Sequence, residues 1–282
     1  MKIKKYHKHV ELKQFQKIHG QLQFAAVAMA IGRPLLGPMD HALAITEREG
    51  LKFVRITKVV RSCLEEWEFI IKVLGKRPIH CRQLVLHPAA YQGFVDASKW
   101  GVGGVWFGRN NCLQPVTRFV KWPPSIASQL ITDECPDGSI SISELELAGI
   151  LLQWLVLETI IPAELLQHCL VAIWCDNIPA VAWLYKLRNS TSQIASNIIR
   201  ALAIRFQKLE VGKLAAEHIP GIFNVMADFN SREHTTNLTD FLTHFSSKFK
   251  PPKDGYWNLC RLKTGLISKV ISELSNKPLR MA

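Results

Sequence analysis

Apolar residues recur at every third or fourth position in the first part of the chain, which is the spacing of helices that bury one face. The pattern predicts one helix over about residues 11–30, closed by Gly32 and Pro34, and a second helix over about 59–74. Residues 1–85 lack the alternation that is typical of strands. We therefore expect a small helical region there, and a plain helical cap on a neighbouring domain explains it as well as any function does.

The pattern changes from helices to strands near residue 84. Short runs rich in β-branched and aromatic residues come first, and apolar helical stretches alternate with strands after them. The predicted order is two strands within 91–107, a strand over 113–122, a helix over 143–159, a strand over 170–175, helices over 180–188 and 193–209, a strand over 213–219 and a short helix over 224–231. Antiparallel strands followed by β-α-β alternation predict an α/β fold in which helices flank a mixed sheet.

These patterns divide the chain into three predicted parts. They are a helical region over 1–85, a sheet domain over 86–235 and a basic C-terminal tail or linker over 236–282. The last part is polar and rich in lysine, and Pro251-Pro252 interrupts it, so we expect only one weak helix near 266–274.

Composition adds a partner and a compartment to this picture. The formal net charge of +12 and the pI near 9.5 favour a polyanionic partner, most simply nucleic acid. Seven cysteines without a CxxC pair argue for a reducing compartment and against a disulfide framework or a structural zinc site. No apolar stretch follows the basic N-terminus, and the apolar run 147–157 is too short to span a bilayer. We expect an intracellular protein, cytoplasmic or nuclear, that is neither secreted nor bound to a membrane.

Four acids stand at the ends of predicted elements: Asp96, Glu146, Asp176 and Asp228. Asp96 and Asp176 end apolar strands, where α/β sheets place their ligands. Asp228 lies at the start of a short helix, where the helix dipole favours a carboxylate. Each acid taken alone has a more common structural explanation, as a turn residue, a helix N-cap or a dipole partner.

The glutamate has a close rival. Ser141-x-x-Glu144 and Ser143-x-x-Glu146 both have the spacing of a capping box, in which a helix-start serine and a glutamate bond each other's backbone. One box uses only one of the two glutamates, so the other is left in the first helical turn beside an apolar stripe.

Taken together, the four acids indicate a metal site. Clustered carboxylates repel one another and are costly to bury, so such a cluster normally requires a cation. Oxygen ligands without accompanying cysteine and histidine sets favour Mg²⁺ or Mn²⁺. Two such ions about 3.5–4 Å apart activate a water and stabilise the leaving oxygen in phosphodiester cleavage.

The motifs around these acids resemble, in order and spacing, the ribonuclease H domain of retroelement reverse transcriptases over about residues 86–232. They are Asp96-Ala97-Ser98-x-x-Gly101-x-Gly103-Gly104, Glu146-Leu147-x-Gly149, Cys175-Asp176-Asn177 and Pro220-Gly221-x-x-Asn224-x-x-Ala227-Asp228. The resemblance implies a five-stranded mixed sheet with helices and cleavage of the RNA strand of an RNA–DNA hybrid by two metal ions.

Carried over by motif, Asp96, Glu146, Asp176 and Asp228 become the catalytic and metal-binding residues. The family pattern favours Glu146 over Glu144, because an apolar residue precedes it and a small residue follows three positions later. The chain departs from the family in two respects: the basic protrusion that grips the hybrid in some cellular members has no evident counterpart, and a histidine found in many members is missing. The loop before Asp228 holds no histidine, since His218 lies earlier and His234 lies later.

The upstream stretch 12–38 looks like the thumb or connection segment that follows a polymerase palm. No Asp-Asp pair occurs in the chain, so the polymerase motif is absent and the resemblance implies a C-terminal piece of a reverse transcriptase polyprotein. Transposases, integrases and proofreading exonucleases fit the motifs less well. A decayed or domesticated fragment that binds nucleic acid without cutting it stays an alternative. A plain protein-interaction module explains neither the acids nor the charge.

Overall fold

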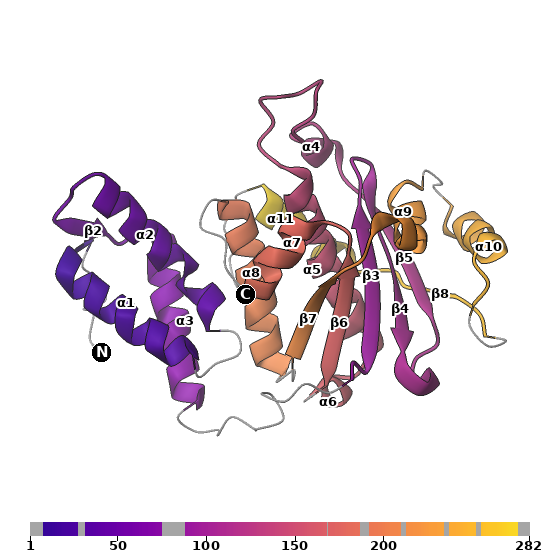
Figure 1. Ribbon diagram of the computed structural model, residues 1–282, viewed down its shortest axis with the longest axis horizontal. Coiled ribbons are helices and arrows are strands. Elements are labelled where there is room, and N and C mark those ends of the chain that lie inside the picture. The colour runs from indigo at the N-terminus through magenta and orange to yellow at the C-terminus, as the bar shows by residue number, and fades with distance from the viewer. Residues whose placement is uncertain are drawn as a thin grey trace.

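The computed structural model describes residues 8–27, 32–74, 88–167, 169–186, 192–209, 213–233, 237–251 and 255–275. It shows a helical N-terminal part beside a larger sheet domain, with helix α8 (Gln193–Leu209) on the side of the sheet domain that faces the N-terminal part (Figure 1). The predicted boundaries at 85 and 235 fall within 75–87 and 234–236, outside the described residues. No helix in the described part of the chain has the length and apolar character needed to cross a membrane.

The N-terminal part has a core of its own. Its elements are β1 (His9–Glu11), α1 (Leu12–Val27), η1 (Arg33–Leu36), α2 (Gly37–Arg48), β2 (Phe53–Arg55) and α3 (Lys58–Leu74). The two predicted helices are confirmed, except that residues 28–30 lie outside the described residues. The sequence did not predict helix α2 or the β1–β2 pair. Gly37-Pro38 is typical of a loop in sequence, but here it begins α2, since proline is tolerated at a helix start. The strands β1 and β2 have three residues each, which is too short to show alternation.

The sheet domain has six strands in the order β7-β6-β3-β4-β5-β8. Their bounds are β3 (Tyr91–Ala97), β4 (Gly101–Gly108), β5 (Val116–Lys121), β6 (Leu170–Cys175), β7 (Lys213–His218) and β8 (Asn258–Leu259). Strands β3, β4 and β5 are antiparallel neighbours, and β6 and β7 run parallel to β3. The predicted mixed α/β sheet is confirmed. The predicted count of five strands is wrong, because β8 from the C-terminal part pairs with the edge of β5.

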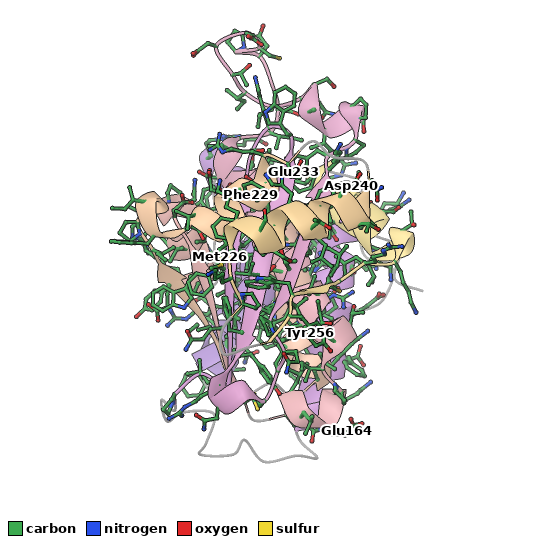
Figure 2. The ribbon with its side chains drawn as sticks, turned by 90° about the vertical axis from the view of Figure 1, so that its right-hand side faces the viewer. Glu164, Met226, Phe229, Glu233, Asp240 and Tyr256 are labelled. Atoms are coloured by element: carbon green, nitrogen blue, oxygen red, sulfur yellow. The ribbon has the colours of Figure 1, made fainter. Side chains whose placement is uncertain are left out.

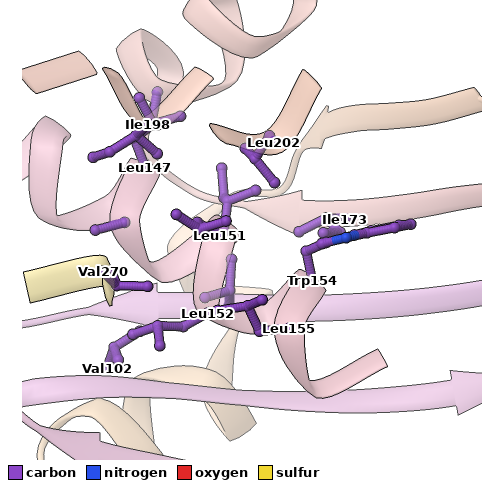
Figure 3. Close-up of a cluster of buried hydrophobic side chains, with 14 of the residues drawn as sticks. Val102, Leu147, Leu151, Leu152, Trp154, Leu155, Ile173, Ile198, Leu202 and Val270 are labelled. Carbon is purple, nitrogen blue, oxygen red and sulfur yellow. The ribbon is translucent and has the colours of Figure 1, made fainter. Parts of the chain in front are cut away.

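Helix α5 (Ile142–Ile160) covers one face of the sheet and is apolar nearly all round. Its side chains form the main core with the sheet and with α8 and α11 (Thr264–Leu274). Figure 3 shows this packing for Val102, Leu147, Leu151, Leu152, Trp154, Leu155, Ile173, Ile198, Leu202 and Val270. A helix enclosed on every side explains why its pattern is a continuous apolar run instead of a stripe.

The opposite face of the sheet carries α9 (Val225–Ser231). Gly103 and Gly104 of β4 have no side chains, so one helix can pack closely against each face of the sheet at this point. A Cβ on Gly103 would lie 2.2 Å from the Cβ of Asn230 in α9, and a Cβ on Gly104 would lie 2.3 Å from Oε1 of Gln153 in α5. The glycines of the Asp96 motif therefore bring both helices, and the acids they carry, close to the sheet.

The prediction of a C-terminal tail or linker over 236–282 is wrong for the residues that the structure describes there. Over residues 237–251 and 255–275 it forms α10 (Leu238–Lys248), β8 and α11, all packed on the sheet domain. Figure 2 shows α10 lying across the sheet beside Met226 and Phe229 of α9. Phe241, Phe245 and Trp257 are buried there against β4 and β5. The weak helix predicted over 266–274 is confirmed as α11, which extends two residues further towards the N-terminus.

The remaining elements connect these layers. They are η3 (Arg109–Asn111), α4 (Pro124–Ala127), α6 (Ala163–Leu166), α7 (Ile178–Lys186) and η4 (Gly221–Phe223). The predicted strand over 170–175 and the predicted helix over 193–209 have the observed bounds of β6 and α8. The predicted helix over 180–188 begins earlier, with Pro179 in its first turn, and residues 187–188 lie outside the described residues.

Candidate active site

The fold brings four chain segments together at one end of the sheet. Strands β3 and β6 are parallel neighbours, so Asp96 near the end of β3 and Asp176 just after β6 emerge side by side. Glu146 reaches the same end from α5, and Asp228 reaches it from α9. The charge of Asp228 raises the pKa of Asp96 and of Asp176, and the charges of Asp96 and Asp176 raise the pKa of Glu146. Each of the four carboxylates therefore lies within electrostatic range of at least one other.

Asp96 is buried and faces α9. The hydroxyl of Ser231 donates a hydrogen bond to its Oδ2, and this bond fixes the orientation of the carboxylate. Burial raises the pKa of Asp96 to about 6 in spite of this hydrogen bond. The charges of Asp176 and Asp228 also raise this pKa, as expected for like charges in one site.

Glu146 is buried on the α5 side of the same strand end. Its Oε2 accepts a hydrogen bond from the backbone N–H of Ala97 at 3.1 Å, and the thiol of Cys175 lies 3.6 Å from the same oxygen. Burial raises the pKa of Glu146 well above its ordinary value, and the charges of Asp96 and Asp176 raise it further.

Glu144 has a different role. It forms the capping box with Ser141: its Oε2 accepts the Ser141 backbone N–H at 2.6 Å, and the Ser141 hydroxyl accepts the Glu144 N–H. Ser192 donates to the other carboxylate oxygen. The capping box occupies Glu144, which leaves Glu146 as the glutamate that faces the other acids.

Asp176 is half-buried against the loop that follows β7. A Cβ on Gly221 would lie 3.0 Å from Oδ2 of Asp176, so glycine lets this loop approach the carboxylate. Burial raises the pKa of Asp176, and the charge of Asp228 adds to the shift. His218 at the end of β7 opposes the shift, as does Arg232.

Asp228 is partly exposed and forms an ion pair on α9. Nε of Arg232, one helical turn later, donates to its Oδ1 at 2.7 Å. Both side chains are largely in solvent, with 62% of Arg232 and 42% of Asp228 exposed. Such an exposed ion pair is weak.

The donor set fits a hard divalent cation. The four carboxylates supply oxygen ligands, and three of them have pKa values raised by burial and mutual repulsion, which a bound cation would relieve. Asn224 adds a buried polar atom at the same end of the sheet. Its Nδ2 donates to the carbonyl of Val95 at 2.9 Å, while its Oδ1 is buried with no hydrogen-bond partner in the described part of the structure.

Three further side chains in contact with the acids were absent from the sequence prediction: Cys175, Ser231 and Arg232. Ser231 and Arg232 follow Asp228 by three and four residues on a helix, which is a spacing that places side chains on one face and could have identified them. Cys175 is adjacent to Asp176, but only the position of α5 shows that its thiol meets Glu146.

A scan of protein-family models finds no match to this chain, and a search of curated proteins finds none either. Among solved structures, the chain is similar to RNase H1 from the halophilic archaeon Halobacterium salinarum NRC-1, with 13% identity, 50% of this chain and 92% of that chain covered, and a TM-score of 0.32. It is also similar to LC11-RNase H1, isolated from compost by a metagenomic approach, with 15% identity, 50% and 91% coverage and a TM-score of 0.34.

A third similar structure is the native protease-reverse transcriptase of prototype foamy virus, with 14% identity and a TM-score of 0.30. The match covers 74% of this chain but only 24% of the viral chain. These likenesses assign no activity to this chain, so its function has to be argued from its own residues.

Proposed function

We propose that this chain is a metal-dependent ribonuclease H that cleaves the RNA strand of RNA–DNA hybrids and that belongs to a retroelement reverse transcriptase. The observation that carries the proposal is the meeting of Asp96, Glu146, Asp176 and Asp228 at one end of the sheet, with raised pKa values for the first three. The four sequence motifs that hold these acids support the same reaction. The net charge of +12 supports a polyanionic substrate.

In this proposal the four carboxylates would hold two divalent ions, either Mg²⁺ or Mn²⁺. Such ions, when bound, supply an activated water and stabilise the leaving oxygen in phosphodiester hydrolysis. The protein's own part is to fix the ligands in place. Ser231 orients Asp96, the Ala97 N–H orients Glu146, and the β6 strand end presents Asp176.

The test is cleavage of a hybrid labelled on its RNA strand, in the presence of Mg²⁺ or Mn²⁺. Asp176→Asn keeps the size of the side chain but removes a charge that the ions need, so we expect a loss of about 10³-fold or more in rate, or about 4 kcal/mol. Asp240→Asn, on the exposed side of α10, is the matched control and should cut at the wild-type rate.

Two results would contradict the proposal. A folded wild-type protein that binds the hybrid without cutting it would indicate a nucleic-acid-binding fragment instead of an enzyme. Equal cutting by the wild type and Asp176→Asn would place the activity outside this group of acids.

A further inference from the structure

Cys175 brings a sulfur atom into a site otherwise built from oxygen ligands. It is the last residue of β6, its side chain is fully buried, and it lies between Glu146 of α5 and Asp176. One ligand atom from each of these three residues lies within 4.8 Å of the other two. Among the residues that the structure describes, they form the one group of three or more such ligands at that spacing.

The distances match a tetrahedral metal ion. A zinc ion lies about 2.3 Å from sulfur ligands and about 2.0 Å from carboxylate oxygens, which places two such ligands about 3.5 Å apart on a tetrahedron. Sγ of Cys175 and Oε2 of Glu146 lie 3.6 Å apart. The pair therefore needs almost no movement to share one ion.

The backbone also prepares the sulfur to act as a ligand. The N–H of Asn177 points at Sγ of Cys175 at 3.4 Å, where it would stabilise a metal-bound thiolate. The thiol of Cys175 donates to the carboxylate of Glu146, so an ion that binds both atoms would replace that proton. The buried thiol of Cys63, in contrast, donates to the backbone carbonyl of Leu35 at 2.8 Å.

We propose that Glu146, Cys175 and Asp176 form a binding site for a thiophilic divalent cation such as Zn²⁺ or Cd²⁺. Binding exchanges the thiol proton of Cys175 for the metal and releases that proton to solvent, with no change in oxidation state. Thiolate favours zinc-like ions over Mg²⁺, so the sulfur gives this site a preference that an all-carboxylate site lacks.

Occupancy has a consequence for catalysis. A thiophilic ion would take Glu146 and Asp176, two of the four acids that the hydrolysis requires, and would compete with Mg²⁺. Zinc would then act as an inhibitor of this site. This inhibition rests on the proposed function, whereas the binding of the ion does not.

The test titrates Cd²⁺ into the full chain without Mg²⁺ and follows the ultraviolet charge-transfer absorption of the cadmium–thiolate bond. We expect a saturating band that Cys175→Ser removes, with a Cd²⁺ affinity at least about tenfold lower in the variant. Cys135→Ser, in the loop after α4, is the matched control and should keep the band, because Cys135 is not part of this group.

A band of equal size in the wild type and Cys175→Ser would overturn the inference. If Cys175→Ser does not fold, Glu146→Gln tests the same site through its oxygen ligand and should weaken Cd²⁺ binding by a similar factor. Unchanged Cd²⁺ affinity in a folded Glu146→Gln would also overturn it.

Hybrid cleavage separates this inference from the proposed function. If the protein cleaves the hybrid but binds Cd²⁺ equally well with and without Cys175, the thiophilic site is rejected and the proposed ribonuclease function stands. If Cd²⁺ binding depends on Cys175 but the protein does not cleave the hybrid, the thiophilic site stands and the proposed ribonuclease function is rejected. If both are correct, micromolar Zn²⁺ should slow Mg²⁺-driven cleavage more in the wild type than in Cys175→Ser, each compared with its own zinc-free rate.

Discussion

Two of the regions that hold buried carboxylates balance their charges differently. At the contact between the N-terminal part and the sheet domain, Glu66 of α3 and Glu273 of α11 lie near Arg200 of α8. Arg200 binds Glu66 through two hydrogen bonds, Nη2 to Oε1 at 2.6 Å and Nε to Oε2 at 3.0 Å. Only 17% and 10% of the two side chains are exposed.

At the candidate active site, the one ion pair that the described residues form is the exposed pair of Asp228 and Arg232. The charges of Asp96 and Asp176 raise the pKa of Glu146, and the charge of Asp176 also raises that of Asp96. The nearby Arg232 is mostly in solvent. Burial lowers the pKa of Arg200, but the hydrogen bond and the charge of Glu66 more than offset this and raise it. Removing one partner of a buried ion pair is costly, whereas clustered acids with raised pKa values mark a candidate functional site.

Two glutamates of helix α5 provide the strongest test of the difference between the two regions. Glu146→Gln should lower hybrid cleavage by about 10²–10³-fold, because it removes a charge from the clustered acids. Glu144→Gln should lower the rate less than about threefold, because the capping box and Ser192 occupy that side chain. Rates are measured at saturating Mg²⁺ on proteins with matched circular dichroism spectra.

The reverse result would be informative. Loss of cleavage in Glu144→Gln with an active Glu146→Gln would mean that the capping glutamate is the ligand, and the environment of Glu146 would then have no functional explanation.

The four acids of the candidate site could be selected from the sequence because each stands beside a local sequence pattern. Asp176 directly follows an apolar strand, and Asp228 opens a short helix beside Pro220-Gly221. The choice between Glu144 and Glu146 could not be made from spacing alone, because both residues fit a capping box. Only the packing of α5 against β3 shows which glutamate meets the backbone N–H of Ala97.

The C-terminal part was missed because its partners are distant in sequence. Phe241 and Phe245 have helical spacing, but they lie among serine, threonine and lysine residues that suggest a solvated tail. Their burial depends on Phe119 of β5 and on Trp257, whose rings lie 4.6 Å from Phe241 and 4.9 Å from Phe245, centre to centre. A two-residue strand such as β8 gives no periodic signal at all.

The contribution of the Arg200–Glu66 pair to stability can be tested by replacing Arg200. Arg200→Leu should lower the free energy of unfolding by about 3 kcal/mol, because it leaves the buried Glu66 without its partner. Urea denaturation measures the change. The double variant Arg200→Leu with Glu66→Leu should recover most of the loss, since apolar residues often replace a buried pair at little cost.

The exposed pair Lys72–Glu68 on α3 is the control for this experiment. Its side chains are 69% and 65% exposed, so Lys72→Leu should change stability by less than about 0.5 kcal/mol. Equal losses at Arg200 and Lys72 would mean that burial does not distinguish the two pairs.

Arg200 lies near both Glu66 and Glu273, and Glu273 tests whether this one arginine offsets the cost of burying both carboxylates. Burial raises the pKa of Glu273 to about 7, and the charge of Arg200 opposes this shift only in part. The ordinary value is 4.5, so between these two values the carboxyl ionises in the unfolded chain before it ionises in the folded protein. The wild type should therefore lose stability as the pH rises from 4.5 to 7 and keep that deficit above pH 7.

Glu273→Gln removes this deficit while it preserves the shape of the side chain. The variant should match the wild type in stability at pH 4 and exceed it by about 3 kcal/mol at pH 8, since each unit of pKa shift corresponds to about 1.36 kcal/mol. Glu65→Gln, on the exposed side of α3, should leave the pH dependence unchanged. A Glu273→Gln variant that is less stable than the wild type at pH 8 would show that Arg200 balances both glutamates, and the region would then be fully paired.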